Sequence, residues 1–149
     1  MNIRRIFLII ACLVSAVAVF VPCYMIQLDG ETVQDGNISL FSAYPFYGIA
    51  ILVLDLFVIG ATIVGLKKGY VIASFINIGV TISSVVNISI NRESAAAVLR
   101  VTGKLLSAFG ESSALIYKVE DGAGFFMLIF SALILLVMMF WNLGNREDY

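Results

Sequence analysis

The sequence predicts an all-α transmembrane four-helix bundle that carries a small extracellular β-sheet of about three strands and an amphipathic outer helix. Of its 149 residues 61% are hydrophobic and only 13% are charged, whereas about a quarter of the residues in a soluble domain are charged. Four apolar stretches approach the roughly 20 residues that a helix needs to cross a membrane. They cover residues 6–22, 46–66, 70–90 and 125–143. Because the chain is too short for two separate cores, we expect one integral membrane domain over residues 1–149, with outer segments 23–45 and 91–124.

Basic residues beside the apolar stretches predict the orientation. The N-terminus, the turn between the second and third stretches and the C-terminus together carry Arg4, Arg5, Lys67, Lys68 and Arg146, while the first outer segment has no Lys or Arg. Lys and Arg concentrate on the cytoplasmic side. We therefore expect a location in the plasma (cytoplasmic) membrane with both termini in the cytoplasm. The first stretch also has the layout of a cleavable signal peptide, but its apolar run continues through Val21, which favours an uncleaved first span.

The first outer segment reads as a β-hairpin. Pro22 should end the first helix, because proline cannot donate to the helical ladder. Residues 23–28 are apolar and β-prone, residues 29–37 contain two Asp-Gly pairs typical of tight turns, and residues 38–44 alternate again. Pro45 then suits the first turn of the next helix.

The second outer segment predicts a helix followed by a strand. Residues 93–110 place apolar side chains at helical spacing and end at a glycine; this outer face consists of Val98, Val101, Leu105 and Phe109. We expect the face to roof the bundle or lie on the membrane, with docking of a partner as the alternative. Residues 114–122 alternate and end in Asp-Gly, so they should add a third strand to a hairpin that alone would be marginal.

This layout of four spans, internal termini and an outer β-structure resembles the claudin-like tetraspan architecture. The resemblance concerns topology only, because residues 24–44 lack the tryptophan and the cysteine pair of the claudin signature. It therefore implies a fold and no junctional function. The chain is also similar to the small four-span membrane proteins of Gram-positive bacteria.

An acidic residue, Asp55, lies in the middle of the second apolar stretch. No Lys, Arg or His occurs within any of the four stretches, so we expect this carboxyl group to be largely neutral and hydrogen-bonded inside the bundle. Counting from the turn between the second and third stretches puts it level with Thr81 within a helical turn. The predicted intramembrane polar layer comprises Asp55, Ser74, Asn77, Thr81 and Ser84. Its use is structural or the binding of a proton or cation, and a third possibility is that Asp55 meets a cation on a partner's helix.

Small residues recur every four positions on two of the predicted helices. They are Ala61, Gly65, Gly79, Ser83 and Asn87. Such stripes allow helices to approach closely. We interpret them as helix-packing positions within the chain, with contact to another copy or a partner as the alternative.

Several chemistries find no support in the sequence. Without histidine there is no Ser/His/Asp or Cys/His set, and neither a phosphate-binding glycine loop nor a metal-binding cysteine pattern occurs. Cys12 and Cys23 are too far apart on one helix to pair and read as packing residues. We expect no catalytic residues, no metal and no cofactor. The formal charge of −1 gives no attraction for nucleic acid.

The function favoured by these observations is that of a non-enzymatic accessory, assembly or scaffolding subunit. Its partners would be the lipid bilayer and another membrane protein or further copies of the chain. The outer segments hold four basic and seven acidic residues, a formal charge of −3. The alternative is a subunit of a small oligomeric channel or transporter that uses Asp55 and the polar face of the third helix. A membrane enzyme using outer acidic residues is a third class.

Overall fold

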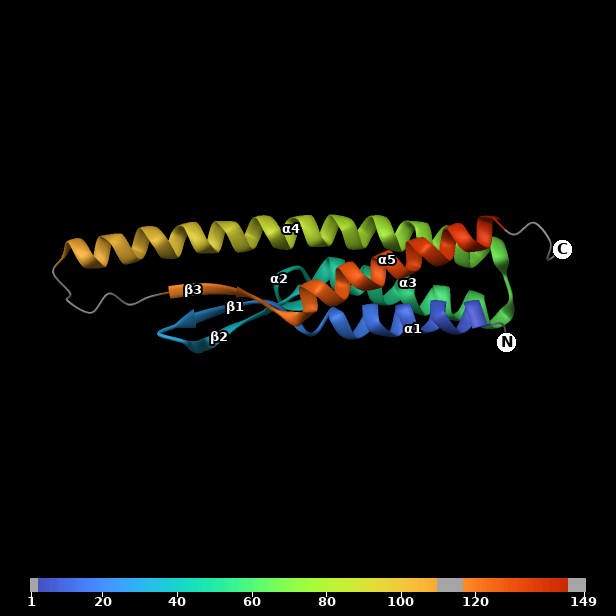
Figure 1. Cartoon of the computed structure of the whole chain (residues 1–149), viewed down its shortest axis with the longest axis horizontal. Helices are drawn as coiled ribbons and strands as arrows, with labels where there is room; N and C mark the ends of the chain where they lie inside the picture. Colours follow the sequence, from blue (N-terminus) through green and yellow to red (C-terminus); the bar gives the residue numbers. More distant parts are fainter. Residues whose placement is uncertain (1–2, 110–116, 145–149) are drawn as a thin grey trace.

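The computed structural model describes residues 3–109 and 117–144, and in this part the chain is mostly helical with one small sheet (Figure 1). In chain order the elements are α1 (Ile3–Ala18), β1 (Pro22–Leu28), β2 (Glu31–Ser39), α2 (Leu40–Ala43), α3 (Pro45–Val64), α4 (Lys67–Ala108), β3 (Tyr117–Asp121) and α5 (Ala123–Gly144). The predicted combination of a mostly helical chain with a three-stranded sheet is confirmed.

Helices α1, α3, α5 and the first half of α4 lie side by side, and we call this part the helical core (Figure 1). Each helix contacts two neighbours, in the order α1, α3, α4, α5 and back to α1. Three of them, α3, α4 and α5, are long and apolar enough to cross a membrane. The 16 residues of α1 rise only about 24 Å.

Polarity in the helical core is inverted relative to a protein folded in water. Large side chains such as Phe57, Phe75 and Phe130 point outward and are more than half exposed. Polar side chains are buried instead, and those that are at most 1% exposed are Ser15, Asp55, Thr62, Ser74, Asn77, Thr81, Ser84 and Ser131. The outward faces are therefore suited to hydrocarbon and not to water.

The turn between α3 and α4 is sharp and ends α3 cleanly. Gly65 caps α3 in the left-handed conformation, with φ of 85°, and its N–H donates to the carbonyl of Ala61. This φ favours glycine, because a side chain would clash with the backbone there. Lys67 already begins α4, so the two helices run antiparallel.

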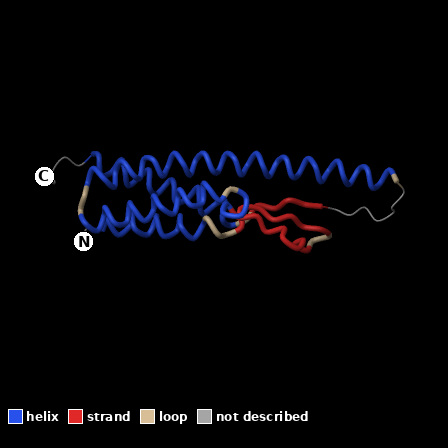
Figure 2. The backbone as a smooth tube through the Cα atoms, turned by 180° about the vertical axis from the view of Figure 1, so that it is seen from behind, coloured by secondary structure: helices blue, strands red, loops and turns tan. Residues whose placement is uncertain are grey.

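Helix α4 differs from the prediction of a third span at 70–90 with a separate outer helix. It is one continuous helix of 42 residues, about 63 Å long, and its second half extends past the helical core alongside the sheet (Figures 1 and 2). Residues 91–97 contain no Pro or Gly and include three consecutive alanines, the best helix formers. The side chains of α4 thus change from apolar to polar after residue 90, but the helix continues without a break. We call residues 91–109, the second half of α4 with its C-cap, the arm.

The sheet has the strand order β2-β1-β3, and both pairs are antiparallel. The first Asp-Gly pair makes the β1–β2 turn, with positive φ at Asp29 and Gly30, as a tight hairpin requires. The second pair lies inside β2, where residues 33–36 bulge between the pairs Met25–Asn37 and Gln27–Thr32.

The prediction of a strand over 38–44 is therefore wrong for most of its length. Strand β2 ends at Ser39, whose side chain caps the single-turn helix α2 through a reciprocal contact with Ser42. This pair satisfies backbone groups at the start of a helix. The predicted third strand is present as β3; its expected residues 114–116 lie outside the described part of the chain.

Two glycines fix the junction between the sheet and the helical core. A Cβ at Gly122 would lie 2.0 Å from the carbonyl oxygen of Pro22, and one at Gly124 would lie 2.2 Å from that of Val21. The start of α5 is therefore packed directly against the backbone that joins α1 to β1.

An ion pair between Arg92 and Asp121, at 2.9 Å, links the arm to β3.

Candidate functional site

The first candidate site is a layer of buried polar side chains in the middle of the helical core. Asp55 of α3 is 1% exposed, and Asn77 Nδ2 of α4 donates to its Oδ1 at 2.7 Å. Ser15 and Cys12 of α1 lie beside the same carboxyl group. Three helices therefore meet at Asp55.

The remaining members of the predicted polar layer lie along the same face of α4. Ser74, Thr81 and Ser84 are all at most 1% exposed. Ser84 Oγ donates to the carbonyl of Thr81 at 2.7 Å. The structure thus brings all five predicted residues to the interior of the helical core, with Asn77 in direct contact with Asp55.

This polar layer separates two apolar clusters of the core. Along α1, Ser15 lies between Leu8 and Ala18, which belong to different clusters. Along α3, Asp55 likewise lies between Ile51 and Val58. The polar groups are thus enclosed by apolar packing toward both ends, where an unpaired polar atom is costly.

Five oxygen atoms of the layer lie outside ordinary hydrogen-bond geometry in the described residues, although Ser15 and Cys12 interact with the carboxyl group of Asp55. They are Ser15 Oγ, Asp55 Oδ2, Ser74 Oγ, Asn77 Oδ1 and Thr81 Oγ1. Other buried hydroxyls are satisfied by their own helix, as Thr62 donates to Val58 and Ser131 to Leu128. Since most buried polar groups in folded proteins are paired, these oxygens, spread over about two turns of α4 and the facing parts of α1 and α3, mark this layer as a candidate site.

Sequence reasoning missed the place of Cys12, which it treated as a packing residue. Cys12 is a free, buried cysteine beside Asp55. The available signal was its spacing: Cys12 and Ser15 are three residues apart and so share one face of α1. Carboxyl, amide and hydroxyl oxygens can together hold a proton or a hard cation.

The predicted helix-packing residues behave in different ways. Ala61 is buried in the core, whereas Gly65 ends α3. Asn87 joins α4 to α3, because its Nδ2 donates to the hydroxyl of Tyr47 at 3.1 Å. Gly79 and Ser83 face outward, and a Cβ at Gly79 would meet nothing within 4 Å. Packing within the chain is therefore wrong for Gly79 and Ser83, and their contact with another copy or a partner stays a prediction.

The second candidate site is the exposed face of the arm. Val98, Val101, Leu105 and Phe109 are 64%, 58%, 54% and 84% exposed. The expectation that this face roofs the helical core is wrong, because α4 runs straight past the core and turns its other side toward β3. An isolated apolar residue on a surface needs no explanation, but four at helical spacing form an exposed apolar row and make this face a candidate site.

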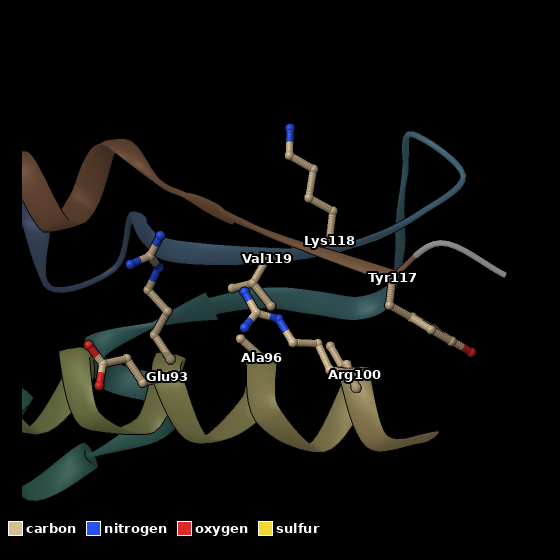
Figure 3. A pocket seen from close by; sticks show the side chains of 8 residues that line it. Glu93, Ala96, Arg100, Tyr117, Lys118 and Val119 are labelled. Carbon is tan, nitrogen blue, oxygen red and sulfur yellow. The ribbon is translucent and has the colours of Figure 1, made fainter. Parts of the chain in front are cut away.

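The side of the arm that faces the sheet borders a partly open cavity of about 300 Å³. Its lining residues are Arg92, Glu93, Ala96, Leu99, Arg100, Tyr117, Lys118 and Val119. Arg100 reaches from α4 toward Val119, whereas Lys118 points away from the helix (Figure 3). Lys118 pairs with Glu120 and lowers the pKa of that carboxyl group below its usual value. The charged residues of the lining are therefore mostly basic, with Arg92, Arg100 and Lys118 against the single acidic residue Glu93.

No protein-family model, no curated protein and no solved structure matches this chain. The two sites therefore have to be interpreted from their own geometry.

Proposed function

We propose that the chain is an integral membrane protein with four spans and that it works as a non-enzymatic accessory, assembly or scaffolding subunit. The inverted polarity of the helical core supports the membrane location, since exposed phenylalanines around a buried carboxyl group suit a bilayer and not water. For the fourth span, the helical hydrogen bonds of α1 continue to Val21, which extends its rise from Ile3 to about 28 Å.

The distribution of charge supports an orientation with both termini in the cytoplasm. Arg4 lies over the ring of Trp141 at 5.1 Å, and Arg5 lies beside Gly65. With Lys67 and Lys68 in the first turn of α4, these basic residues gather at the end of the core that lies farthest from the sheet. Basic residues at short cytoplasmic connections are the usual determinant of topology. The sheet and the arm would then stand on the outer side of a plasma membrane.

The observation that carries the interaction function is the exposed face of the arm. Within the membrane, lipid would cover the outward side chains of α4. Beyond Asn91 the same helix continues into water, yet Val98, Val101 and Leu105 stay more than half exposed. They lie among exposed residues in the described chain, and Val98 is about 46 Å along α4 from Lys67, beyond a hydrocarbon core of about 30 Å. We infer that a protein anchored in the same membrane covers this face, because such a partner can pack along α4 from the bilayer to the arm.

Site-specific photocrosslinking in native membranes tests this proposal. A photoreactive residue at Val98, Val101 or Leu105 should form a discrete adduct with one partner. Leu99 supplies the matched control, since it lies on the same helix but lines the cavity beside the sheet. Adducts at Leu99 as strong as those at Val101, or no adduct at any position, would contradict the proposal. An adduct of twice the chain mass would identify a second copy as the partner.

A further inference from the structure

The outward side of α4 carries a repeat of 11 residues that runs from the helical core into the arm. Its positions follow at intervals of four, three and four residues, and they stay on one side of the helix because 11 residues complete three turns. Gly79, Ile90 and Val101 occupy the first position, Ser83, Ser94 and Leu105 the second, and Val86, Ala97 and Ala108 the third. We call these nine residues the seam. All nine are exposed and none is charged, so the seam is one uncharged strip about 44 Å long.

The fold leaves the seam open along its length. The helical core and the sheet lie to the same side of α4, which forms one edge of the molecule (Figures 1 and 2). The exposed charged residues of the arm are Glu93, Arg100 and Lys104, and all three lie off the seam. Lipid can cover the seam only up to about Ile90, since a hydrocarbon core is about 30 Å thick. A partner that covers the whole seam therefore needs a helix that crosses the bilayer and continues beyond it.

We propose that this partner is a second copy of the chain, and that the two α4 helices pack in parallel along the seam. The proposal rests on the membrane location and the interacting arm proposed above. Two copies in one membrane share one orientation, so a two-fold axis along the membrane normal places each seam residue opposite its own equivalent. A charge in the seam would then face a like charge. A different partner could offer the opposite charge, whereas a symmetric pair requires the uncharged strip that α4 has.

The side chains of the seam also suit close packing of two helices. Five of the nine are Gly, Ser or Ala, which let backbones approach, and four are Val, Ile or Leu, which supply apolar surface. Both the 11-residue repeat and the small residues are typical of right-handed helix pairs. A strip about 44 Å long and about 12 Å wide, the diameter of a helix, gives about 1,100 Å² over both copies. This area reaches the roughly 1,000 Å² of a specific interface.

Disulfide crosslinking of single cysteines in native membranes tests the pairing. Both free cysteines are first replaced by alanine. Ser83→Cys in the helical core and Ala97→Cys in the arm should each give a covalent dimer on oxidation with iodine, because equivalent seam positions come within the roughly 4–7 Å that a disulfide spans between Cα atoms. Ile82→Cys and Ala96→Cys are the matched controls and should stay monomeric. Each is next to a seam position, but Ile82 lies on another side of the helix and Ala96 lines the cavity beside the sheet.

Mixing two differently tagged variants tests the register. Ser83 and Ala97 lie about 21 Å apart along α4, so a parallel pair in register forms no disulfide between Ser83→Cys and Ala97→Cys. Such a mixed dimer would overturn the proposal. Equal crosslinking at seam and control positions, or monomer at every position, would also overturn it.

A charge placed in the seam gives a second measurement that needs no cysteine. Ala97→Lys should raise the Kd of the dimer in mild detergent by about tenfold or more, because the new charge faces its own copy. Thr102→Lys, also exposed on the arm but off the seam, should leave the Kd unchanged. Equal effects of the two substitutions would contradict the pairing. Monomer here together with a discrete adduct of another protein at Val101 would overturn the second copy alone, whereas failure of both experiments would also refute the proposed function.

Discussion

Replacing Gly122 by alanine tests how the sheet is joined to the helical core. The new Cβ would lie 2.0 Å from the carbonyl oxygen of Pro22 and 2.7 Å from its carbonyl carbon. Both are backbone atoms, so no side-chain rotation relieves the overlap. The strand must move by about 1.5 Å to restore an ordinary contact of about 3.5 Å, and this movement lengthens the hydrogen bond from Gly122 N–H to the carbonyl of Cys23, now 2.8 Å.

The expected cost combines two effects. Overpacking a tight site costs about 1–3 kcal/mol, and weakening a buried backbone hydrogen bond costs about 1 kcal/mol more. We therefore expect Gly122→Ala to lower the free energy of unfolding by about 3 kcal/mol and the melting temperature by about 6–12 °C. Thermal unfolding in detergent, followed by circular dichroism, measures the change.

Gly103→Ala is the matched control for this substitution. Gly103 lies in the arm, and a Cβ there would meet nothing within 4 Å. The same chemical change should stabilise the chain by up to about 1 kcal/mol, because alanine favours a helix over glycine. The reasoning is refuted if Gly122→Ala unfolds at the wild-type temperature, or if the two substitutions have the same effect.

Three further predictions concern single side chains. Val101→Lys should change the free energy of unfolding by less than about 0.5 kcal/mol, because the side chain is 58% exposed. It should nevertheless abolish recovery of the partner in affinity purification. Loss of folding would contradict this prediction. Asn77→Leu should cost about 2–3 kcal/mol in chemical unfolding, because it leaves Asp55 without its donor, whereas Ser83→Ala on the exposed side should be neutral. Burial raises the pKa of Cys23 to about 11 from 9.0. Unfolding should therefore release a proton, and the melting temperature should fall as pH rises from about 9 to 11. A melting temperature that rises over this pH range would contradict the burial of the thiol.

The helices were predictable because their signal is local. Long apolar stretches favour helices, because a helix satisfies its own backbone hydrogen bonds. Pro45 and Gly65 set the limits of α3. The break expected after residue 90 was wrong for a physical reason. Hydropathy indicates whether a helix is surrounded by lipid or by water. The helix itself continues until a residue such as Pro or Gly ends it, and residues 91–97 contain neither.

The sheet shows where local signals are ambiguous. Two Asp-Gly pairs occur in the first outer segment, and either can form a hairpin turn. Only pairing with β1 decides that the first makes the turn and the second a bulge. The contact between Asp55 and Asn77 was partly accessible, because counting residues from the α3–α4 turn places them within about one helical turn. That Gly79 and Ser83 face outward depends on how α4 is rotated against its neighbours, which a stripe of small residues does not reveal.

The central claim is that the sheet and the arm stand on one side of a membrane and the α3–α4 turn on the other. Labelling of single cysteines in intact cells with a membrane-impermeant maleimide tests it most directly, in a background with Cys12→Ala and Cys23→Ala. Asp35→Cys in β2 and Lys104→Cys in the arm should both react from outside, and Lys68→Cys only after permeabilisation. Labelling of Asp35→Cys and Lys104→Cys from opposite sides of the membrane would contradict the account.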